Sequence, residues 1–166
     1  SGLVNIQVNG SVDASGGIGQ GEWLIDPYDV EIGSSNSQTF GNLFEPDDNT
    51  ATVSATSIAN ALQTQDVTVS TRNNAGTSEG GTITVDAALT NINVSSSGQS
   101  LILVAAEDII VKQSISSSGG PLNILLAAQG NVEIGTSAGS NNVDITTLGG
   151  TFTVSGSNDD GNANFD

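Results

Sequence analysis

Paired carboxylates are the residues of this chain whose type and spacing could do chemistry. Asp26 with Asp29, or Asp47 with Asp48, could supply the acid and the base of glycoside cleavage, which needs two carboxyl groups about 5–10 Å apart. Enzymes that act on acidic sugars also need cationic groups, and the chain has only two basic residues. It has no His and no Cys, which excludes imidazole and thiolate chemistry. We therefore predict a protein with no catalytic activity and no organic cofactor.

Two acidic clusters offer the oxygen ligands that Ca²⁺ prefers. One consists of Glu45, Asp47 and Asp48, and the other of Asp159 and Asp160, each with an Asn close by. Neither has the closing bidentate Glu of an EF-hand loop, and neither recurs as a short calcium-binding repeat. Two interpretations stay open for these clusters: a calcium site and a solvated acidic loop.

The charge balance limits the partners of the protein. Of the 166 residues, 18 are acidic and 2 are basic (Arg72 and Lys112), which gives a formal net charge of −16. Such a charge repels nucleic-acid phosphates and anionic lipid headgroups. No apolar run approaches the ~20 residues of a membrane-spanning helix. We expect no nucleic-acid binding and no membrane insertion. The start at Ser1, without Met or a signal sequence, predicts a processed or excised piece of a longer product.

Short segments in which apolar and polar residues alternate recur through the second half of the chain, as they do in half-buried strands. One series begins at Ile83, and a second series follows it, with each member placed about half a step after a member of the first. The first comprises Ile83/Val85, Leu101/Leu103, Leu122/Ile124 and Val143/Ile145, and the second comprises Ile92/Val94, Ile109/Val111, Val132/Ile134 and Phe152/Val154.

This periodicity predicts an all-β fold, a right-handed parallel β-helix (β-solenoid) with coils of about 20 residues. Segments one coil apart would stack at the ~4.8 Å strand spacing, so that Leu101, Leu122 and Val143 would form one apolar row. Gly- and Ser-rich segments between the strands would form the corners. The alternative is a β-sandwich, but the Asn-Gly pair that hairpins favour occurs just once, at Asn9-Gly10.

Three segments depart from the periodicity. Residues 33–50 are rich in Ser, Asn and Gln and predict an insertion loop, and residues 157–166 predict an acidic tail rich in Gly and Asn. Residues 55–63 have apolar side chains at helical spacing, with Thr56 or Ser57 as the N-cap. A short helix and a bulged coil both remain compatible with this last pattern. The whole chain of 166 residues is expected to be a single β-helix segment of a larger protein.

Three outward positions break the rule that such positions are polar. Ile102 and Val104 alternate out of phase with the inward leucines of the same strand, and Leu125 lies one expected coil after Val104. One coil apart, these residues are expected to stack into an apolar stripe on the outside of the fold. Either the 33–50 insertion covers this stripe, or the stripe contacts a partner molecule.

Five segments of the chain carry a resemblance to a known repeat family. They are residues 21–32 (GEWLIDPYDVEI), 56–62 (TSIANAL), 67–71 (VTVST), 81–85 (GTITV) and 101–111 (LILVAAEDIIV). These segments resemble filamentous-haemagglutinin-type proteins, which are large secreted adhesins, many of them exported by the two-partner secretion route. The resemblance covers about residues 21–134, and the Asn-rich motifs of that family's secretion domain are not found.

The resemblance implies a right-handed parallel β-helix displayed outside a Gram-negative-type bacterial cell and acting in adhesion, aggregation or fibre construction. We therefore expect a structural or adhesive segment of a secreted or cell-surface protein. Its expected partners are other surface proteins, surface glycans or copies of itself. Two alternatives stay open: a filament subunit that stacks through open coil ends, and a polysaccharide-processing β-helix enzyme.

Overall fold

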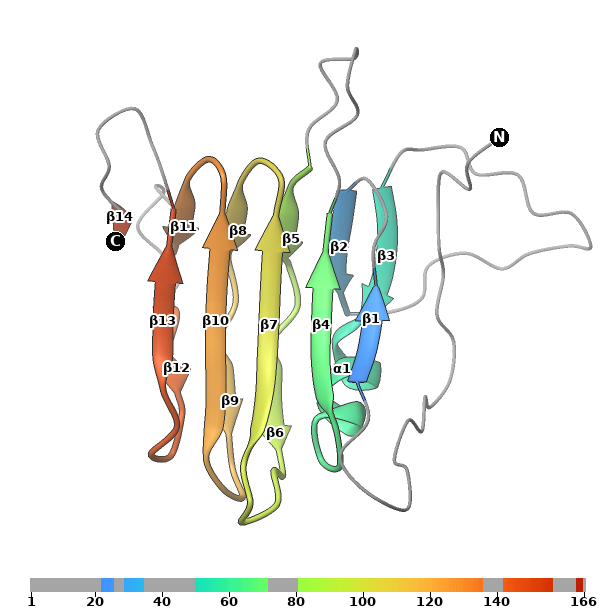
Figure 1. Ribbon diagram of the computed structural model, residues 1–166, viewed down its shortest axis with the longest axis vertical. Coiled ribbons are helices and arrows are strands. Elements are labelled where there is room, and N and C mark those ends of the chain that lie inside the picture. The colour runs from blue at the N-terminus through green and yellow to red at the C-terminus, as the bar shows by residue number, and fades with distance from the viewer. Residues whose placement is uncertain are drawn as a thin grey trace, which may run out of the picture.

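The computed structural model describes residues 22–25, 29–34, 50–71, 81–135, 142–156 and 164–165. Their regular structure consists of strands and one short helix (Figure 1). The elements are β1 (Glu22–Ile25), β2 (Asp29–Gly33), β3 (Thr50–Ser54), α1 (Ala55–Ala61), β4 (Asp66–Ser70), β5 (Ile83–Val85), β6 (Leu89–Ile92), β7 (Gln99–Ala105), β8 (Ile109–Val111), β9 (Ile115–Ser117), β10 (Leu122–Ala128), β11 (Val132–Ile134), β12 (Ile145–Thr146), β13 (Phe152–Ser155) and β14 (Asn164–Phe165).

The strands form three sheets in which every described strand pair is parallel. The five-stranded sheet has the order β1-β4-β7-β10-β13, the six-stranded sheet β14-β11-β8-β5-β2-β3, and the three-stranded sheet β12-β9-β6. From β5 onward the chain visits the six-, three- and five-stranded sheets in turn and then repeats that order (Figure 1). The expected parallel strands are therefore present, and the expected acidic tail contains β14, which pairs with β11.

The step between stacked residues is longer than the sequence pattern predicted. Ile83 pairs with Ile109 rather than with Leu101, and Leu101 pairs with Ile124 rather than with Leu122. The additional residues between stacked strands form a third short strand and the turns around it. The two apolar series in the sequence did not distinguish this third strand from the other two. Alternation has a period of two, so a register shifted by two residues looks equally good in the sequence.

The predicted apolar row through Leu101, Leu122 and Val143 is accordingly wrong. Leu122 pairs with Gln99 rather than with Leu101, although both lie on the neighbouring strands β7 and β10. Val143 lies two residues before β12, which belongs to the three-stranded sheet. Each of the two predicted series thus mixed strands of different sheets.

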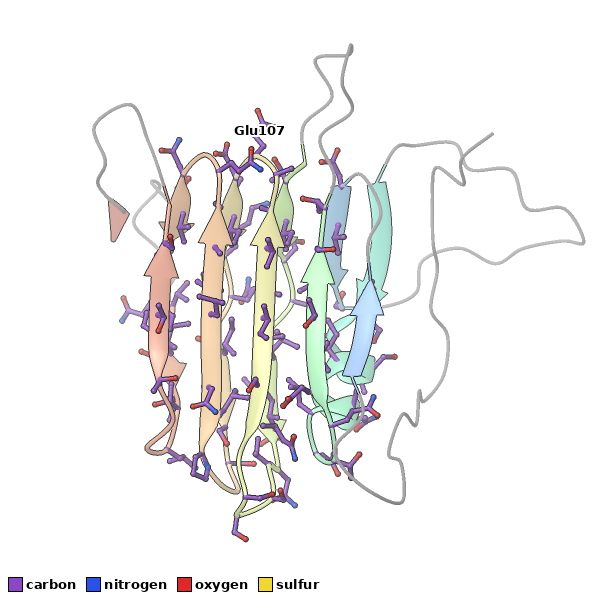
Figure 2. All side chains as sticks on the ribbon, in the orientation of Figure 1. Glu107 is labelled. Carbon is purple, nitrogen blue, oxygen red and sulfur yellow. The ribbon has the colours of Figure 1, made fainter. Side chains whose placement is uncertain are left out.

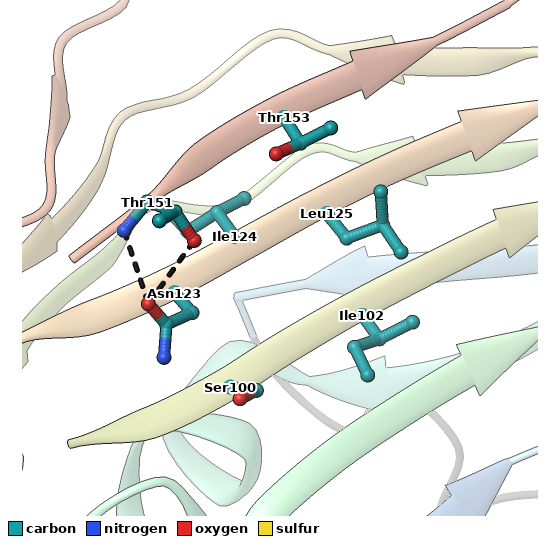
Figure 3. A pocket seen from close by; sticks show the side chains of 7 residues that line it. All are labelled: Ser100, Ile102, Asn123, Ile124, Leu125, Thr151 and Thr153. Carbon is teal, nitrogen blue, oxygen red and sulfur yellow. Dashed lines mark hydrogen bonds between the residues drawn. The ribbon is translucent and has the colours of Figure 1, made fainter.

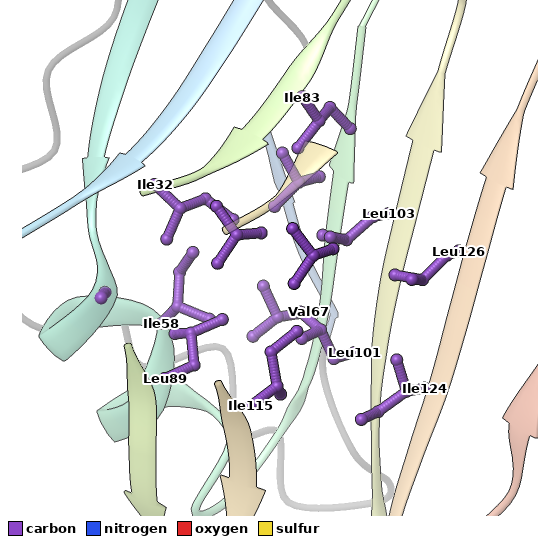
Figure 4. Close-up of a cluster of buried hydrophobic side chains, with 14 of the residues drawn as sticks. Ile32, Ile58, Val67, Ile83, Leu89, Leu101, Leu103, Ile115, Ile124 and Leu126 are labelled. Atoms are coloured by element: carbon purple, nitrogen blue, oxygen red, sulfur yellow. The ribbon is translucent and has the colours of Figure 1, made fainter. Parts of the chain in front are cut away.

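The core lies between the sheets and is built from the inward residue of each alternating pair. Along β7, the residues Leu101 and Leu103 are fully buried, and their stacked neighbours Ile124 and Leu126 on β10 are buried as well. Figure 4 shows these side chains meeting others from the six- and three-stranded sheets, such as Ile83 and Leu89, in one core. Burial of each such side chain stabilises the fold by about 1.5–3 kcal/mol. Apolar ladders are therefore the main source of stability.

The predicted helix is confirmed, and the bulged coil is wrong. Ile58 and Leu62 lie fully buried on one side of α1, and Ile58 faces the core near Leu89 (Figure 4). The N-cap is Ser54, not Thr56 or Ser57, because β3 remains paired with β2 up to Ser54 and the helix begins directly afterwards. A helix of this length is held by packing rather than by propensity. Among the described residues, no helix has the length and apolar composition needed to cross a membrane.

Candidate functional site

The outward side of the five-stranded sheet, from β4 to β13, is nearly free of charge. Its outward side chains alternate with the core residues of the same strands. We call the following residues the neutral face: Thr68, Ser70, Ser100, Ile102, Val104, Asn123, Leu125, Ala127, Thr151, Thr153 and Ser155. One carboxylate, Asp66, lies at its border, where its Oδ1 accepts a hydrogen bond from Ser100 N at 2.7 Å.

The outward side of the six-stranded sheet has the opposite character. Its outward positions, which we call the acidic face, carry Asp29, Glu31, Asp86, Asp108 and Glu133. The one cation among the described residues, Lys112, forms an exposed ion pair with Asp86 at 3.2 Å. The five- and six-stranded sheets lie on opposite sides of the core (Figures 1 and 2). Charge is therefore segregated between two faces of the molecule.

A shallow hollow of about 260 Å³ lies on the neutral face and crosses β7, β10 and β13 (Figure 3). Ile102 and Leu125 are directly paired neighbours in the sheet, and Thr153 is the next residue in the same row. The lining residues are Ser100, Ile102, Asn123, Ile124, Leu125, Thr151 and Thr153. The hollow thus combines two partly buried aliphatic side chains with a row of hydroxyl and amide groups.

The structure brings together two of the three predicted partner-contact residues. Ile102 and Leu125 lie side by side, whereas the predicted stacking of Val104 with Leu125 is wrong, because Val104 pairs with Ala127. Val104 remains on the neutral face beside the hollow and is 39% exposed. The expectation that residues 33–50 cover this stripe concerns residues that fall largely outside the described ones.

Asn123 is held in one orientation at the edge of the hollow. Its Oδ1 accepts hydrogen bonds from Thr151 N at 3.0 Å and from Thr151 Oγ1 at 3.1 Å (Figure 3). These two donors require the amide oxygen to face β13, which turns Nδ2 towards β7 and Ser100. Within the described part of the chain, Asn123 Nδ2 has no hydrogen-bond partner. Its two N–H donors are therefore held in a fixed direction at the edge of the hollow.

Asn123 was not among the residues predicted from the sequence, yet its position follows a pattern. In several strands, an outward acidic or amide side chain directly precedes a core residue and accepts a hydrogen bond from the backbone at the start of the next strand in the sheet, as Asn123 does directly before Ile124. Asp29 Oδ1 accepts from Thr82 N at 2.8 Å, and Asp108 Oδ1 accepts from Asn131 N at 2.7 Å. An Asp or Asn at an outward position directly before a core residue is the sequence feature that these positions share.

The predicted calcium ligands Glu45, Asp47, Asp48, Asp159 and Asp160 lie outside the described residues. Within the described ranges, no group of three or more His, Cys, Asp or Glu side chains could hold a metal ion. A calcium site in the two acidic clusters therefore stays a prediction.

Comparisons with known proteins add no relative. No protein-family model matches the chain, and a search of curated proteins returned no match.

Proposed function

We propose that the chain is a non-catalytic, structural and adhesive segment of a secreted or cell-surface β-solenoid, which contacts other molecules through its neutral face. Right-handed winding of the coils is part of this proposal and follows the general crossover preference. Two features support it: the repeated visit of the chain to three parallel sheets in a fixed order, and the resemblance to filamentous-haemagglutinin-type adhesins.

The segregation of charge is the observation that carries the contact role. A protein with a net charge of −16 repels most acidic neighbours, yet the neutral face has no charge of its own. Contact there requires little desolvation of ionised groups. Ile102, Val104 and Leu125 offer partly exposed apolar surface for such a contact. The acidic face, across the core, keeps the molecule soluble.

Retention of coated beads tests this proposal. Beads carrying the chain are passed over surfaces coated with neutral polysaccharide, with protein, or with the same chain. We expect retention on at least one surface, and loss of retention when Ile102→Ser and Val104→Ser are combined. The matched control is Ile110→Ser, which makes the same change at an outward position of the acidic face.

Two results would contradict the contact role. Beads that adhere to none of the three surfaces would remove its basis. A fall in the melting temperature of the Ile102→Ser, Val104→Ser double variant well beyond twice that of Ile110→Ser would mean that another part of the chain covers the stripe.

A second candidate, a filament subunit that stacks through its coil ends, is favoured by the exposure of Phe152. Val67, Leu101 and Ile124 occupy the same inward row and are at most 1% exposed, whereas Phe152, at the end of that row, is 39% exposed. A second copy stacked on β13 would bury this ring and pair the outer edge of β13, which has no strand partner among the described residues.

Sedimentation across a concentration series tests the filament model. Stacking predicts particles that lengthen with concentration and revert to monomers in Phe152→Glu. A wild-type chain that stays monomeric at all concentrations, with no fibres in negative-stain images, would rule the filament model out.

A further inference from the structure

We propose that the hollow on the neutral face binds a neutral carbohydrate, one or two uncharged sugar rings of a longer chain. This inference rests on the proposed contact role of that face and names the class of ligand. Three independent properties of the hollow lead to it: its charge, its fixed hydrogen-bond donors and its aliphatic floor.

Charge excludes acidic ligands. None of the seven residues that line the hollow is ionisable. The nearest carboxylate in the row, Asp66, directs its Oδ1 to Ser100 N, and the protein as a whole carries a charge of −16. An acidic sugar would meet only repulsion there, with no cation among the lining residues to offset it. A ligand suited to this hollow is therefore uncharged.

Hydrogen-bonding groups at the hollow match a ligand rich in hydroxyl groups. Asn123 Nδ2 supplies two N–H donors whose direction is fixed by the bonds of Oδ1 to Thr151. The hydroxyls of Ser100 and Thr153 can each donate and accept, and neither has a hydrogen-bond partner among the described residues. A sugar hydroxyl also donates and accepts, so it can satisfy both kinds of group without any charge.

The aliphatic floor matches the other side of a sugar ring. Ile102 and Leu125 lie side by side in one row of the lining residues, and the polar row Ser100, Asn123 and Thr151 is the other (Figure 3). A pyranose ring has hydroxyls around its rim and C–H groups on its faces, so it can pack on these side chains while its rim reaches the polar row. The volume of about 260 Å³ is below that of a pocket for a drug-sized ligand and suits one or two rings.

The spacing between strands indicates that the sugar chain crosses the strands of the sheet. Equivalent positions recur every ~4.8 Å from strand to strand, as in the polar row Ser100, Asn123 and Thr151. The rise per ring of an extended polysaccharide is close to this spacing. A chain that crosses the strands would therefore place successive rings over neighbouring strands, such as β7 and β10 or β10 and β13, and one that runs along the strands would not.

Calorimetric titration with soluble hexasaccharides tests the inference. The probes are a β-linked and an α-linked neutral glucose hexamer, and an acidic galacturonic acid hexamer. We expect at least one neutral hexamer to bind and the acidic one not to bind. The decisive variant is Asn123→Asp, which keeps the acceptor for Thr151 but removes both donors. Asp108 already uses a carboxylate in this kind of bond.

Asn123→Asp should weaken sugar binding by about tenfold or more, the loss expected for an interaction with a fixed donor. Its melting temperature should stay close to that of the unmodified chain. The matched control is Thr84→Asp, which adds the same charge on the acidic face and should leave sugar binding unchanged. Leu125→Ser should also weaken binding, because it removes part of the aliphatic floor.

Three outcomes would overturn the inference. They are no heat with either neutral hexamer, equal affinity in Asn123→Asp, and concentration-dependent dimers in sedimentation that Leu125→Ser abolishes. The last outcome would assign the hollow to a second copy of the chain and leave the contact role of the neutral face intact. If the chain binds sugar in solution but the coated beads are not retained, the sugar inference stands and only the adhesive role is contradicted.

Discussion

Thr71 Oγ1 donates a hydrogen bond to the carbonyl oxygen of Gly81, further along the chain, and accepts one from Ala106 N at 3.0 Å. Thr71 is buried directly after β4, where its own N–H donates to Val104 O. One hydroxyl thus ties the exit of β4 to the entry of β5 and to the turn after β7. This bond network positions β4, the first strand of the neutral face.

Replacing Thr71 by Val should destabilise the fold with little change in shape. The variant leaves Ala106 N–H without its acceptor, and it puts a methyl group against Gly81 O. We expect the free energy of unfolding to fall by about 1–3 kcal/mol, the cost of an unsatisfied buried polar group. Urea denaturation measures this loss. Thr71→Ser, which retains the hydroxyl, should cost clearly less, and equal losses in both variants would refute the role of the hydroxyl.

Neighbouring residues on β7 should differ sharply in their effect on stability. Leu103 is fully buried between Val69 and Leu126 in the apolar ladder, whereas the adjacent Val104 is 39% exposed. Leu103→Ala should cost about 2–5 kcal/mol, because it opens a cavity in the core. Val104→Ala should change stability by about 0.5 kcal/mol or less. Similar costs at the two positions would contradict the assignment of inward and outward sides.

A cation placed on the acidic face should stabilise the protein at low salt. Thr84 lies directly beside Glu31 in the sheet, and Asp86 follows two residues later on the same side. Thr84→Lys should add about 0.2–1 kcal/mol through cross-strand attraction. The gain should disappear at about 1 M salt, where the Debye length is ~3 Å. Thermal melting of Thr84→Lys and of the uncharged control Thr84→Gln, at low and high salt, checks this.

The calcium prediction has a direct test. A site at Glu45, Asp47 and Asp48, or at Asp159 and Asp160, predicts heat of binding and a higher melting temperature in millimolar Ca²⁺. Mg²⁺ at the same concentration is the control for screening of charge. If Ca²⁺ and Mg²⁺ change the heat and the melting temperature equally, the clusters are solvated acidic loops and not a calcium site.

Much of the strand content could be predicted from the sequence, because alternation of apolar and polar residues directly reports burial. Ile83, Leu101 and Ile109 were all expected to point inward, and all are buried. Which strand stacks on which could not be predicted, because a shift by two residues preserves the alternation. The pairing of Leu101 with Ile124 depends on corner lengths that the pattern does not encode.

The candidate site was predictable only in part. Ile102 and Leu125 were identified because apolar residues at outward positions are unusual. Their true pairing, and the role of Asn123, depend on the register of β7, β10 and β13. The segregation of charge was hidden for the same reason, since acidic residues that are spread along the chain come together on one face only after the strands are stacked.

The unequal steps between paired residues have a consequence for how such a chain can change. Leu101, Ile124 and Phe152 stand in one row, yet the stretch of chain from Ile124 to Phe152 is longer than the stretch from Leu101 to Ile124. The segments between strands therefore absorb added or lost residues while the pairing partners stay in place. New peptide segments, such as an epitope or a tag, could be grafted at a corner without shifting the surface beside it, so the scaffold and its displayed loops are free to diversify separately.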